Sequence, residues 1–468
     1  MNSIRRFRFS RLCSGELRLL WCFIVAMGTL CFASVSEGKI LHVPSEYDTI
    51  QSAIDAASDG DEVVVADGIY TGDGNKNLEF LGKAITVRSE NGPENCIIDC
   101  ESSGRGFYFH HDEDSSSVVK GFTIRNGYVD GAWPQDSGGG ILCASSSPTI
   151  IDNIIINNSV LYGGGGICCF ESSNPIIQNN TIRENFAFLG GGIYCFRSSP
   201  MITDNDIMSN ITDSHGGGIS CSDYSDPIIQ NNTIIGNRGR IGTGTGGGVE
   251  CYHYASPTII NNIIAKNSAG NGGGIFCFDS SYPIIANNTI VRNFARTSAG
   301  IAVGRFASPT VINTILWNVG EEVHLDASSI SITYSNVQGG YEGEGNIDAV
   351  PKFLSLKEGD YHLRPTSPCI GAGTNVGAPP FDKDGKPRPN PPFSNCDIGA
   401  YESRLGNPRG SALAPKITGK LSSTWGKIKK DRKRENEKMR HELKGGHERR
   451  EKTRNPPHLP LVKRELRR

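Results

Sequence analysis

The middle of the chain is built from a repeating unit in which apolar residues recur at every second position. The clearest copy spans residues 190–210 and reads GGGIYCFRSSPMITDNDIMSN. Ile193 and Cys195 share one face of a strand, whereas a helix places positions i and i+2 on different faces. Pro200 disfavours a helix through the middle of the unit and is acceptable at the start of a strand. The pattern therefore predicts short β-strands separated by bends.

The unit recurs at a nearly constant period. The apolar residue that follows the glycines is found at Ile141, Ile167, Ile193, Ile219, Val249, Ile275 and Ile301. All steps between these anchors are equal, except for the longer one from Ile219 to Val249. Such a period indicates a solenoid, in which each unit buries its apolar face against its neighbours. With three short strands and three bends in each unit, we predict an all-β parallel β-helix whose coils contain about 26 residues.

Stacking the coils places equivalent residues above one another, about 4.8 Å apart. The cysteines two positions after the anchor should face the interior as buried thiols, because parallel side-chain directions disfavour disulfides between neighbouring coils. These are Cys143, Cys169, Cys195, Cys221, Cys251 and Cys277. An asparagine also follows each repeat proline by five positions, at Asn153, Asn180, Asn205, Asn232, Asn262 and Asn288. We predict that these amides form a structural hydrogen-bonded ladder at one corner.

These repeats resemble the right-handed parallel β-helices of the pectate-lyase-like superfamily. Asn185 and Ala187, followed by GGGIYC at 190–195, are similar to the GGA-I repeats of polymorphic outer-membrane proteins. The segment PIIQNNTIIGN at 227–237 is similar to repeats of carbohydrate-binding and sugar-hydrolase β-helices. The resemblance covers about residues 43–402. It implies the fold and leaves the activity open, because one fold hosts many unrelated functions.

The composition divides the chain into five segments. Residues 1–38 have a positive start, an apolar run at 19–32 and small residues after it. This is typical of a secretion signal, with an uncleaved anchor as the alternative. Residues 39–137 are predicted to hold an N-terminal cap and irregular coils, with a helix at 50–57 that covers the open first coil. Regular repeats follow at 138–318, the last coils and a C-terminal segment at 319–402, and a basic tail at 403–468. We therefore expect an extracellular or cell-surface protein.

The C-terminal segment resembles the choice-of-anchor type found on secreted bacterial β-helix proteins. The matching motifs are GDYHL at 359–363, SPCI at 367–370 and CDIGAYE at 396–402. Such segments are associated with cell-surface or extracellular proteins. Cys369 and Cys396 bracket the segment and form the predicted disulfide.

A formal net charge of −2 conceals two oppositely charged regions. Residues 416–468 contain 19 Lys and Arg against 7 Asp and Glu, whereas residues 39–415 contain 23 against 40. The tail is poor in large apolar residues and is predicted to be disordered. It is either a solvated extension, an electrostatic attachment to an anionic polymer, or a segment that folds back on the acidic coils. The chain contains no specific nucleic-acid motif.

The outer face of the sheet that carries the cysteines is the predicted functional surface. In pectate-lyase-like enzymes the substrate cleft follows the exterior of one sheet, and the resemblance implies a similar position here. Aromatic side chains that stack on sugar rings are predicted at Phe170, Tyr194, Phe196, Tyr252, Phe276 and Phe278. The alternative is that the C-terminal segment or a loop packs over these rings, because large exposed apolar patches usually have a partner.

Charged residues follow this sheet in a row of nearly alternating sign: Glu171, Arg197, Asp223, His253, Asp279 and Arg305. Neighbouring coils of opposite sign attract, so the row is expected to form structural pairs. Alternatively, Asp223 with His253 or Asp279 would perform acid–base chemistry. In that interpretation Arg197 and Arg305 would bind an acidic sugar.

The sequence offers little evidence for a cofactor. It lacks the catalytic residue sets of polygalacturonases and pectate lyases, and no zinc or calcium motif supports a metal site. The run HHDED at 110–114 has side chains suited to metals but is typical of a solvated turn. The expected function is polysaccharide binding or adhesion by a monomer without catalysis. The alternative is a polysaccharide lyase or glycoside hydrolase that acts on acidic glycans.

Overall fold

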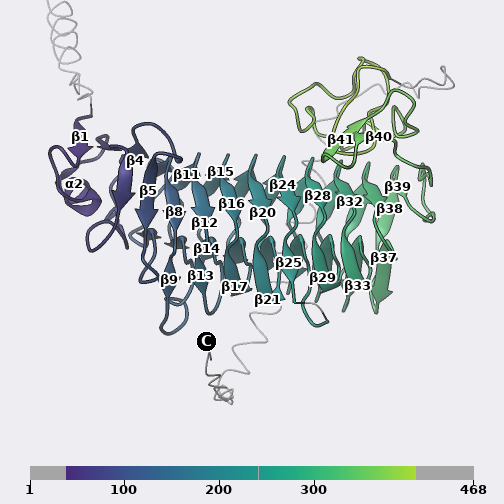
Figure 1. The fold of residues 1–468 in the computed structure, drawn as a ribbon. Helices are drawn as coiled ribbons and strands as arrows, with labels where there is room; N and C mark the ends of the chain where they lie inside the picture. The colour runs from purple at the N-terminus through teal and green to yellow at the C-terminus, as the bar shows by residue number, and fades with distance from the viewer. Residues whose placement is uncertain (1–37, 241, 407–468) are drawn as a thin grey trace, which may run out of the picture.

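The structure is a computed structural model that describes residues 38–240 and 242–406. The chain winds into a parallel β-helix whose coils stack along one axis (Figure 1). Each regular coil contributes one strand to each of four sheets, which are named A to D and whose strands are given below. After the glycine triplet the chain passes through sheet C, then A, then B and then D. Strands of neighbouring coils pair in register, for example Ile167 with Ile193 in sheet C. The predicted all-β solenoid is confirmed.

The strands of each sheet follow in spatial order along the axis. Sheet A contains β1 (Ile40–Val43), β2 (Glu62–Val65), β4 (Thr86–Ser89), β7 (Val118–Lys120), β11 (Thr149–Ile151), β15 (Ile176–Gln178), β19 (Met201–Thr203), β23 (Ile228–Gln230), β27 (Thr258–Ile260), β31 (Ile284–Ala286), β35 (Thr310–Ile312) and β38 (Ser331–Thr333). Sheet B contains β3 (Gly68–Tyr70), β5 (Cys96–Asp99), β8 (Thr123–Arg125), β12 (Ile154–Ile156), β16 (Thr181–Arg183), β20 (Asp206–Met208), β24 (Thr233–Ile235), β28 (Ile263–Ala265), β32 (Thr289–Val291), β36 (Ile315–Trp317) and β39 (Asn336–Val337).

The other two sheets are shorter because the first and last coils are irregular. Sheet C contains β6 (Phe107–Phe109), β10 (Ile141–Ala144), β14 (Ile167–Phe170), β18 (Ile193–Phe196), β22 (Ile219–Ser222), β26 (Val249–Tyr252), β30 (Ile275–Phe278), β34 (Ile301–Gly304) and β37 (Val323–Asp326). Sheet D contains β9 (Tyr128–Val129), β13 (Ser159–Val160), β17 (Phe186–Leu189), β21 (Ile211–His215), β25 (Arg238–Gly239), β29 (Ser268–Asn271) and β33 (Phe294–Thr297).

The interior of the coils is one continuous apolar core. The isoleucines and cysteines of the repeat point inward, and Ile193 and Cys195 are fully buried. The six stacked cysteines are free thiols, as predicted. Burial raises the pKa of the Cys143 thiol well above its ordinary value. This side chain therefore behaves as a small apolar group.

Sheet D is a fourth strand position that the repeat pattern did not predict. It lies immediately before the glycine triplet, where the chain turns sharply back into sheet C. Gly190 has φ +58°, a conformation that favours glycine. A Cβ on Gly191 would collide with the carbonyl oxygen of Ile211 in β21. The triplet therefore lets the end of each sheet D strand lie against the outer face of sheet C, where Leu189 packs against the buried Tyr194.

The predicted asparagine ladder is confirmed at the corner between sheets A and B. The Asn205 amide donates to Asn232 Oδ1 at 3.0 Å and to the Ile177 carbonyl at 2.8 Å. The same pattern repeats from coil to coil, as in other stacked amide ladders. A second ladder, which was not predicted, occupies the corner between sheets B and D. It consists of Asn158, Asn185, Asn210, Asn237, Asn267, Asn293 and Asn318.

Glu322 ends the second ladder in place of another asparagine. Its carboxylate accepts hydrogen bonds from the backbone and side-chain nitrogens of Asn318, the latter at 2.7 Å. Burial raises the pKa of Glu322 from its ordinary 4.5 to about 7, although both hydrogen bonds act in the opposite direction. Between about pH 4.5 and about pH 7, the Glu322 carboxyl group stays protonated in the folded chain but has lost its proton in the unfolded chain. Glu322 therefore lowers the free energy of unfolding as the pH rises from about 4.5 to about 7.

We predict that Glu322→Gln weakens this pH dependence. The amide does not titrate, so the decrease in Tm between about pH 5 and about pH 7.5 should be smaller than in the wild-type chain. Thermal unfolding followed by circular dichroism measures the difference. Glu342→Gln, at an exposed position, is the matched control and should keep the wild-type slope. Equal slopes for wild type and Glu322→Gln would refute this account.

A short helix covers the first coil, as predicted for residues 50–57. It is α2 (Ile50–Ala56), and Thr49 caps its start by accepting a hydrogen bond from the Ser52 backbone at 3.2 Å. Such a cap satisfies a backbone donor that has no partner within the helix. Ile50, Ala53 and Ile54 are fully buried against the coil beneath. The helix removes an open apolar end that would invite association.

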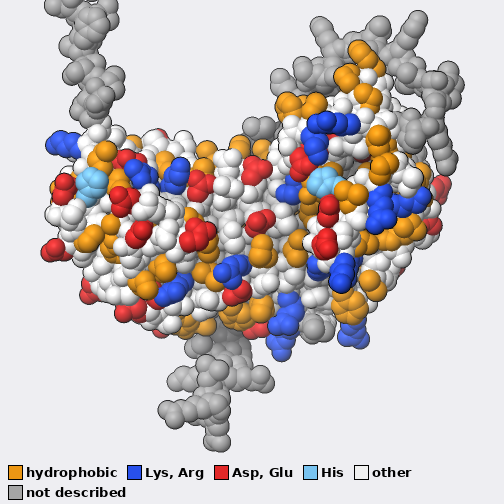
Figure 2. Space-filling model, turned by 45° about the horizontal axis from the view of Figure 1, so that its top comes forward, with side chains coloured by type: hydrophobic (Ala, Val, Ile, Leu, Met, Phe, Trp, Pro, Cys, Tyr) orange, Lys and Arg blue, Asp and Glu red, His pale blue; other side chains and the backbone are white. Residues whose placement is uncertain are grey.

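The C-terminal segment packs outside the last coils rather than continuing them (Figure 1). Its strands β40 (Phe353–Ser355) and β41 (Asp360–Leu363) form an antiparallel pair. Phe353 and Tyr361 contact outward residues of sheet B, including Ile263 and Ile315. Figure 2 shows this segment raised above the coils, over a face that carries charged side chains of both signs. The segment therefore does not cover the aromatic row of sheet C.

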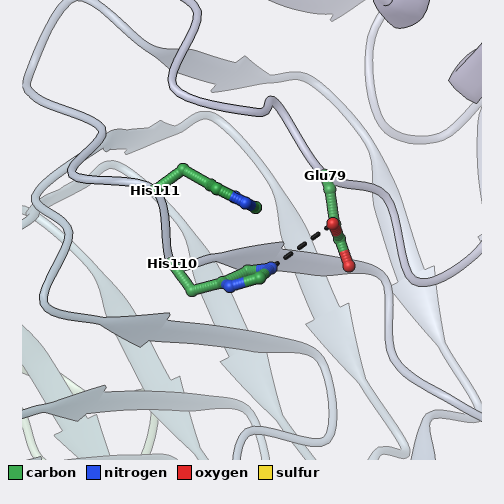
Figure 3. Close-up of side chains that lie close together, drawn as sticks. All are labelled: Glu79, His110 and His111. Atoms are coloured by element: carbon green, nitrogen blue, oxygen red, sulfur yellow. Dashed lines mark ion pairs between the residues drawn. The ribbon is translucent and has the colours of Figure 1, made fainter.

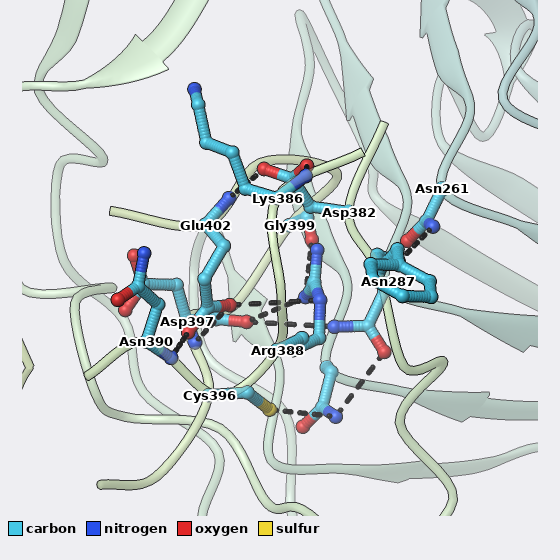
Figure 4. A network of polar contacts seen from close by, with 12 residues as sticks. Asn261, Asn287, Asp382, Lys386, Arg388, Asn390, Cys396, Asp397, Gly399 and Glu402 are labelled. Atoms are coloured by element: carbon cyan, nitrogen blue, oxygen red, sulfur yellow. Dashed lines mark hydrogen bonds and ion pairs between the residues drawn. The ribbon is translucent and has the colours of Figure 1, made fainter. Parts of the chain in front are cut away.

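The motif CDIGAYE organises a buried polar network in this segment (Figure 4). The fully buried Arg388 guanidinium donates to the carbonyls of Gly399 and Ala400 and lies 3.5 Å from Glu402 Oε2. Glu402 accepts from the backbone nitrogens of Asn390 and Asp397. Burial raises the pKa of Glu402 to about 7. These residues hold the segment together, so their role here is structural.

The predicted disulfide between Cys369 and Cys396 is wrong in this structure. Both are buried free thiols with partners of their own. Cys396 Sγ donates to the Thr374 carbonyl at 3.0 Å, and Cys369 Sγ accepts from Asn336 Nδ2 at 3.1 Å. The polar network and the apolar contacts with sheet B hold the segment instead.

Two predicted segments lie largely outside the described residues: the secretion signal at 1–38 and the basic tail at 403–468. Among the residues that the structure does describe, no helix has the length and apolar character needed to cross a membrane.

Candidate functional site

The outer face of sheet C carries two rows of outward side chains. The first row contains Leu142, Cys168, Tyr194, Ser220, Glu250, Phe276 and Ala302, and all of them are buried. The second row contains Ala144, Phe170, Phe196, Ser222, Tyr252, Phe278 and Gly304. The ends of the sheet D strands cover the first row, so only the second row borders solvent.

This arrangement corrects two of the predicted sugar-stacking residues. Tyr194 and Phe276 belong to the covered row and are 2% and 8% exposed. They are structural side chains between sheets C and D. The other four predicted rings, Phe170, Phe196, Tyr252 and Phe278, are partly exposed in the second row.

The four partly exposed rings form two stacked pairs. Phe170 and Phe196 lie 5.5 Å apart with an interplanar angle of 12°, and Tyr252 and Phe278 lie 6.1 Å apart at 6°. Trp133 packs edge-on against Phe170 and Phe196 at 4.9 and 5.5 Å. The predicted alternative that a loop packs over the row is therefore confirmed for this first pair. The ring contacts of Trp133 in the described structure do not include Tyr252 or Phe278.

A small side chain separates the two aromatic pairs. In register, Ser222 pairs with Phe196 on one side and Tyr252 on the other. Its hydroxyl lies 3.0 Å from the Tyr194 hydroxyl. Between Ala144 and Gly304 the row therefore consists of two rings, a buried serine and two rings, and we call the serine position the polar gap.

A buried carboxylate that sequence reasoning missed lies beside this gap. Glu250 is 1% exposed and accepts hydrogen bonds from the hydroxyls of Ser220 at 2.8 Å and Thr245 at 2.9 Å. His215 Nδ1 lies 3.0 Å from Glu250 Oε1, and its ring stacks on Tyr252 with centroids 6.0 Å apart. The only hint in the sequence was a glutamate at a repeat position where other coils carry Leu, Cys, Tyr, Ser, Phe or Ala.

Opposing effects set the protonation of His215. Burial by itself lowers its pKa, but the Glu250 carboxylate, through its charge and hydrogen bond, raises the pKa above the ordinary value. A histidine in this position holds its proton more readily than a free imidazole. When protonated, it forms an ion pair with the Glu250 carboxylate beside the gap.

The predicted pairing along the charged row is confirmed. Arg197 Nη1 lies 3.0 Å from Glu171 Oε1, and His253 Nδ1 lies 2.8 Å from Asp223 Oδ1. The third pair, Arg305 and Asp279, is looser at 3.9 Å. The hydrogen bond to Asp223 raises the pKa of His253, and burial opposes it. Asp223 and His253 are thus together, whereas Asp279 pairs with Arg305.

Both arginines also extend beside the aromatic row. The Arg197 guanidinium lies 5.0 Å from the Phe196 ring centroid, and that of Arg305 lies 5.6 Å from the Phe278 centroid. Cations at this range are attracted to the faces of aromatic rings. The arginine side chains are 53% and 60% exposed. The face therefore offers flat apolar surfaces next to exposed positive charge.

The comparisons with known proteins identify the fold family. The family model for the right-handed beta helix region matches residues 64–237 and, in a second overlapping match, 191–346. The chain belongs to the right-handed β-helix family. No curated protein matches this chain.

Solved structures of this fold resemble the chain only distantly. A pectate lyase, Pel9A, is 15% identical, with 79% of this chain and 97% of that chain covered and a TM-score of 0.47. An alginate lyase from Paenibacillus sp. str. FPU-7 is 15% identical over 62% and 99% of the two chains, with a TM-score of 0.34. The A-module of the Azotobacter vinelandii mannuronan C-5 epimerase AlgE4 is 14% identical over 64% and 95%, with a TM-score of 0.35. Similarity at this level concerns the fold alone.

The sequence predicted which side chains of sheet C point outward but not how deeply each of them is buried. The outward positions were predicted correctly from the period-2 pattern, and the charged pairs followed from the coil spacing. The covering of one row by sheet D and the His215–Glu250 pair were missed, because both depend on where the fourth strand crosses the neighbouring sheet.

Proposed function

We propose that this β-helix binds polysaccharide along the outer face of sheet C, outside the cell or at its surface, without catalysing a reaction. The observation that carries the proposal is the pair of Tyr252 and Phe278, whose rings lie nearly parallel, partly exposed and outside the ring contacts of Trp133 in the described structure. Flat rings repeated along an axis suit a chain of sugar rings, each of which has an apolar face. Exposed apolar surfaces of this kind often mark a binding site.

The charges beside the row favour an acidic glycan. Arg197 and Arg305 are more than half exposed on their side chains, and each pairs with a single carboxylate on the neighbouring coil among the described residues. A uronate carboxylate that approaches the row would accept hydrogen bonds from these guanidinium groups. His215 and His253, both with raised pKa values, add donors near the gap.

We predict that Tyr252→Ala combined with Phe278→Ala weakens glycan binding by about tenfold or more, because each stacked ring contributes about 0.5–1.5 kcal/mol. A glycan array, followed by titration of the best ligand, measures the effect. The matched control combines Phe188→Ala with Phe294→Ala, which removes two exposed rings from sheet D. Unchanged affinity in the Tyr252 and Phe278 double variant would refute binding at this face.

The basic tail provides a second way to bind an anionic polymer and must be separated from the first. Attachment through the tail alone would weaken steeply with salt, since its contacts are exposed charges. A chain that ends at Gly406 keeps every described residue and lacks the tail. If it binds the same glycans at about 0.5 M salt, where screening acts within a few ångströms, the coils are the binding surface.

The alternative function is a lyase or glycoside hydrolase that acts on acidic glycans. It is favoured by the two histidine–carboxylate pairs, His253 with Asp223 and His215 with Glu250, beside the same gap. Assays for unsaturated products and for new reducing ends on each bound glycan distinguish the two functions. Product formation that disappears in Asp223→Asn or Glu250→Gln while binding persists would replace our proposal with catalysis.

A further inference from the structure

Three potential metal ligands gather at the N-terminal end of the same β-helix face (Figure 3). Glu79 follows Leu78, which forms a parallel bridge with Phe107 of β6. His110 and His111 come directly after the end of β6. The coil register thus brings a carboxylate and two imidazoles together from two successive coils of the solenoid.

The geometry of the three groups is close to that of a metal site. One ligand atom from each residue can be chosen so that all lie within 4.8 Å of one another. His110 Nε2 is 3.3 Å from Glu79 Oε2. Two ligands on a tetrahedral zinc ion, with bonds of about 2.0–2.1 Å, have a similar separation. His110 Nε2 is also buried without a hydrogen-bond partner in the described structure.

Neighbouring residues hold His110 and Glu79 in position. The His110 ring stacks on Tyr108 with centroids 3.9 Å apart and planes 15° apart, and the Arg105 guanidinium lies over the Tyr108 ring. Gln51 fixes the backbone of Glu79, since it accepts from the Glu79 nitrogen and donates to the Glu79 carbonyl, both at 3.0 Å. Such support fixes side-chain positions before a ligand arrives.

The loop that carries His111 is held by the buried Glu113 carboxyl group, while His111, Asp112 and Asp114 are exposed, as expected of a solvated turn at 110–114. Glu113 is 2% exposed and accepts from the backbone nitrogens of His111 at 2.9 Å and Gly82 at 3.0 Å. The Ser146 hydroxyl donates to it at 2.8 Å.

We propose that Glu79, His110 and His111 bind one divalent transition-metal ion, with Zn²⁺ as the best match. Two imidazoles and one carboxylate are a typical ligand set for zinc, whereas calcium and magnesium require mostly oxygen ligands. Three protein ligands leave one coordination position for water. This site is independent of the proposed glycan binding, because none of its ligands belongs to the aromatic row.

Zinc titration of the full chain by calorimetry tests the site, with Co²⁺ absorption as a report on ligand geometry. Loss of outer-shell partners alone costs about 10–100-fold in metal affinity, so His111→Ala and Glu79→Gln should each weaken zinc binding by about 100-fold or more. His324→Ala is the matched control. His324 lies 3.4 Å from Glu321 in a similar pair, and among the described residues three ligands gather only at Glu79.

Thermal unfolding distinguishes the loss of zinc binding from a loss of stability in a variant. Without metal, His111→Ala should unfold at the wild-type temperature, because the His111 side chain is exposed. With zinc in excess, Tm should rise in the wild type and not in the variant. The histidines at 441, 447 and 458 are present in both the wild-type chain and the variant, so they do not affect the difference in Tm between the two. Equal zinc affinity in wild type and His111→Ala, or no zinc binding by either, would overturn the proposal.

Discussion

Replacement of Gly217 by alanine is expected to lower the free energy of unfolding by more than about 4 kcal/mol, at the extreme of single substitutions. A Cβ at this position would lie 2.6 Å from the Gly247 carbonyl oxygen and 2.8 Å from the Arg238 nitrogen. Both are backbone atoms of neighbouring coils and cannot rotate away. The glycine triplet thus sets the separation between the end of sheet D and the start of sheet C. Urea unfolding measures the loss.

Gly236→Ala is the matched control for this substitution. Gly236 has φ +68°, but a Cβ there meets nothing closer than the Ser209 hydroxyl at 3.7 Å. Alanine should therefore cost only the strain of a left-handed conformation, about 1–2 kcal/mol. Equal effects of the two substitutions would show that the close approach of the coils at Gly217 costs no more than backbone strain at Gly236, and would contradict this account.

The second large effect is expected for Asn232→Leu, which should destabilise the fold by about 3 kcal/mol or more, because each buried polar group left unpaired costs about 1–3 kcal/mol. Asn232 Oδ1 accepts from the backbone and side-chain nitrogens of Asn205 at 2.9 and 3.0 Å. Its Nδ2 donates to the Ile202 carbonyl at 2.8 Å. Leucine has a similar size but satisfies none of these groups.

Asn174→Ala provides the comparison at an exposed position of the repeat. The Asn174 side chain makes hydrogen bonds to Ser172 and Ser199 at the surface, so water can replace them. We expect a change below about 1 kcal/mol in the same urea titration. If Asn232→Leu is tolerated equally well, the ladder is not a source of stability.

The fold was predictable because the same short repeat, recurring at a nearly constant spacing, determines most of the coils. The apolar residues at every second position identified Ile193 and Cys195 as inward side chains. The constant spacing between copies of the repeat predicted that equivalent residues stack from coil to coil. The Asn205 ladder followed for the same reason. The second ladder, which includes Asn210, is formed by the last asparagine of the same repeat, for which no prediction was made from the sequence. Its burial depends on sheet D, which the pattern did not reveal.

The site was only partly predictable because it depends on contacts between coils. The outward direction of Tyr194 was correct, but its burial follows from the sheet D strand that crosses it. His215 pairs with Glu250, and His110 with Glu79, across successive coils, so neither pair forms a local motif. The predicted disulfide at the ends of the C-terminal segment relied on the places of its cysteines, and the structure shows two thiols with separate partners.

These features extend the chemistry of one face along the axis. A histidine–carboxylate group begins it at Glu79, stacked rings and a polar gap follow, and exposed arginines lie beside the rings. The aromatic row is the proposed glycan surface, and the Glu79 group is a separate proposed metal site at the N-terminal end of the same face.

The most direct test is a crystal structure of the chain with the acidic oligosaccharide that binds best in the array. Our account predicts sugar rings lying flat over Tyr252 and Phe278, with a carboxylate within hydrogen-bond distance of Arg305. An oligosaccharide bound over sheet A or B, with the aromatic row left uncovered, would contradict it.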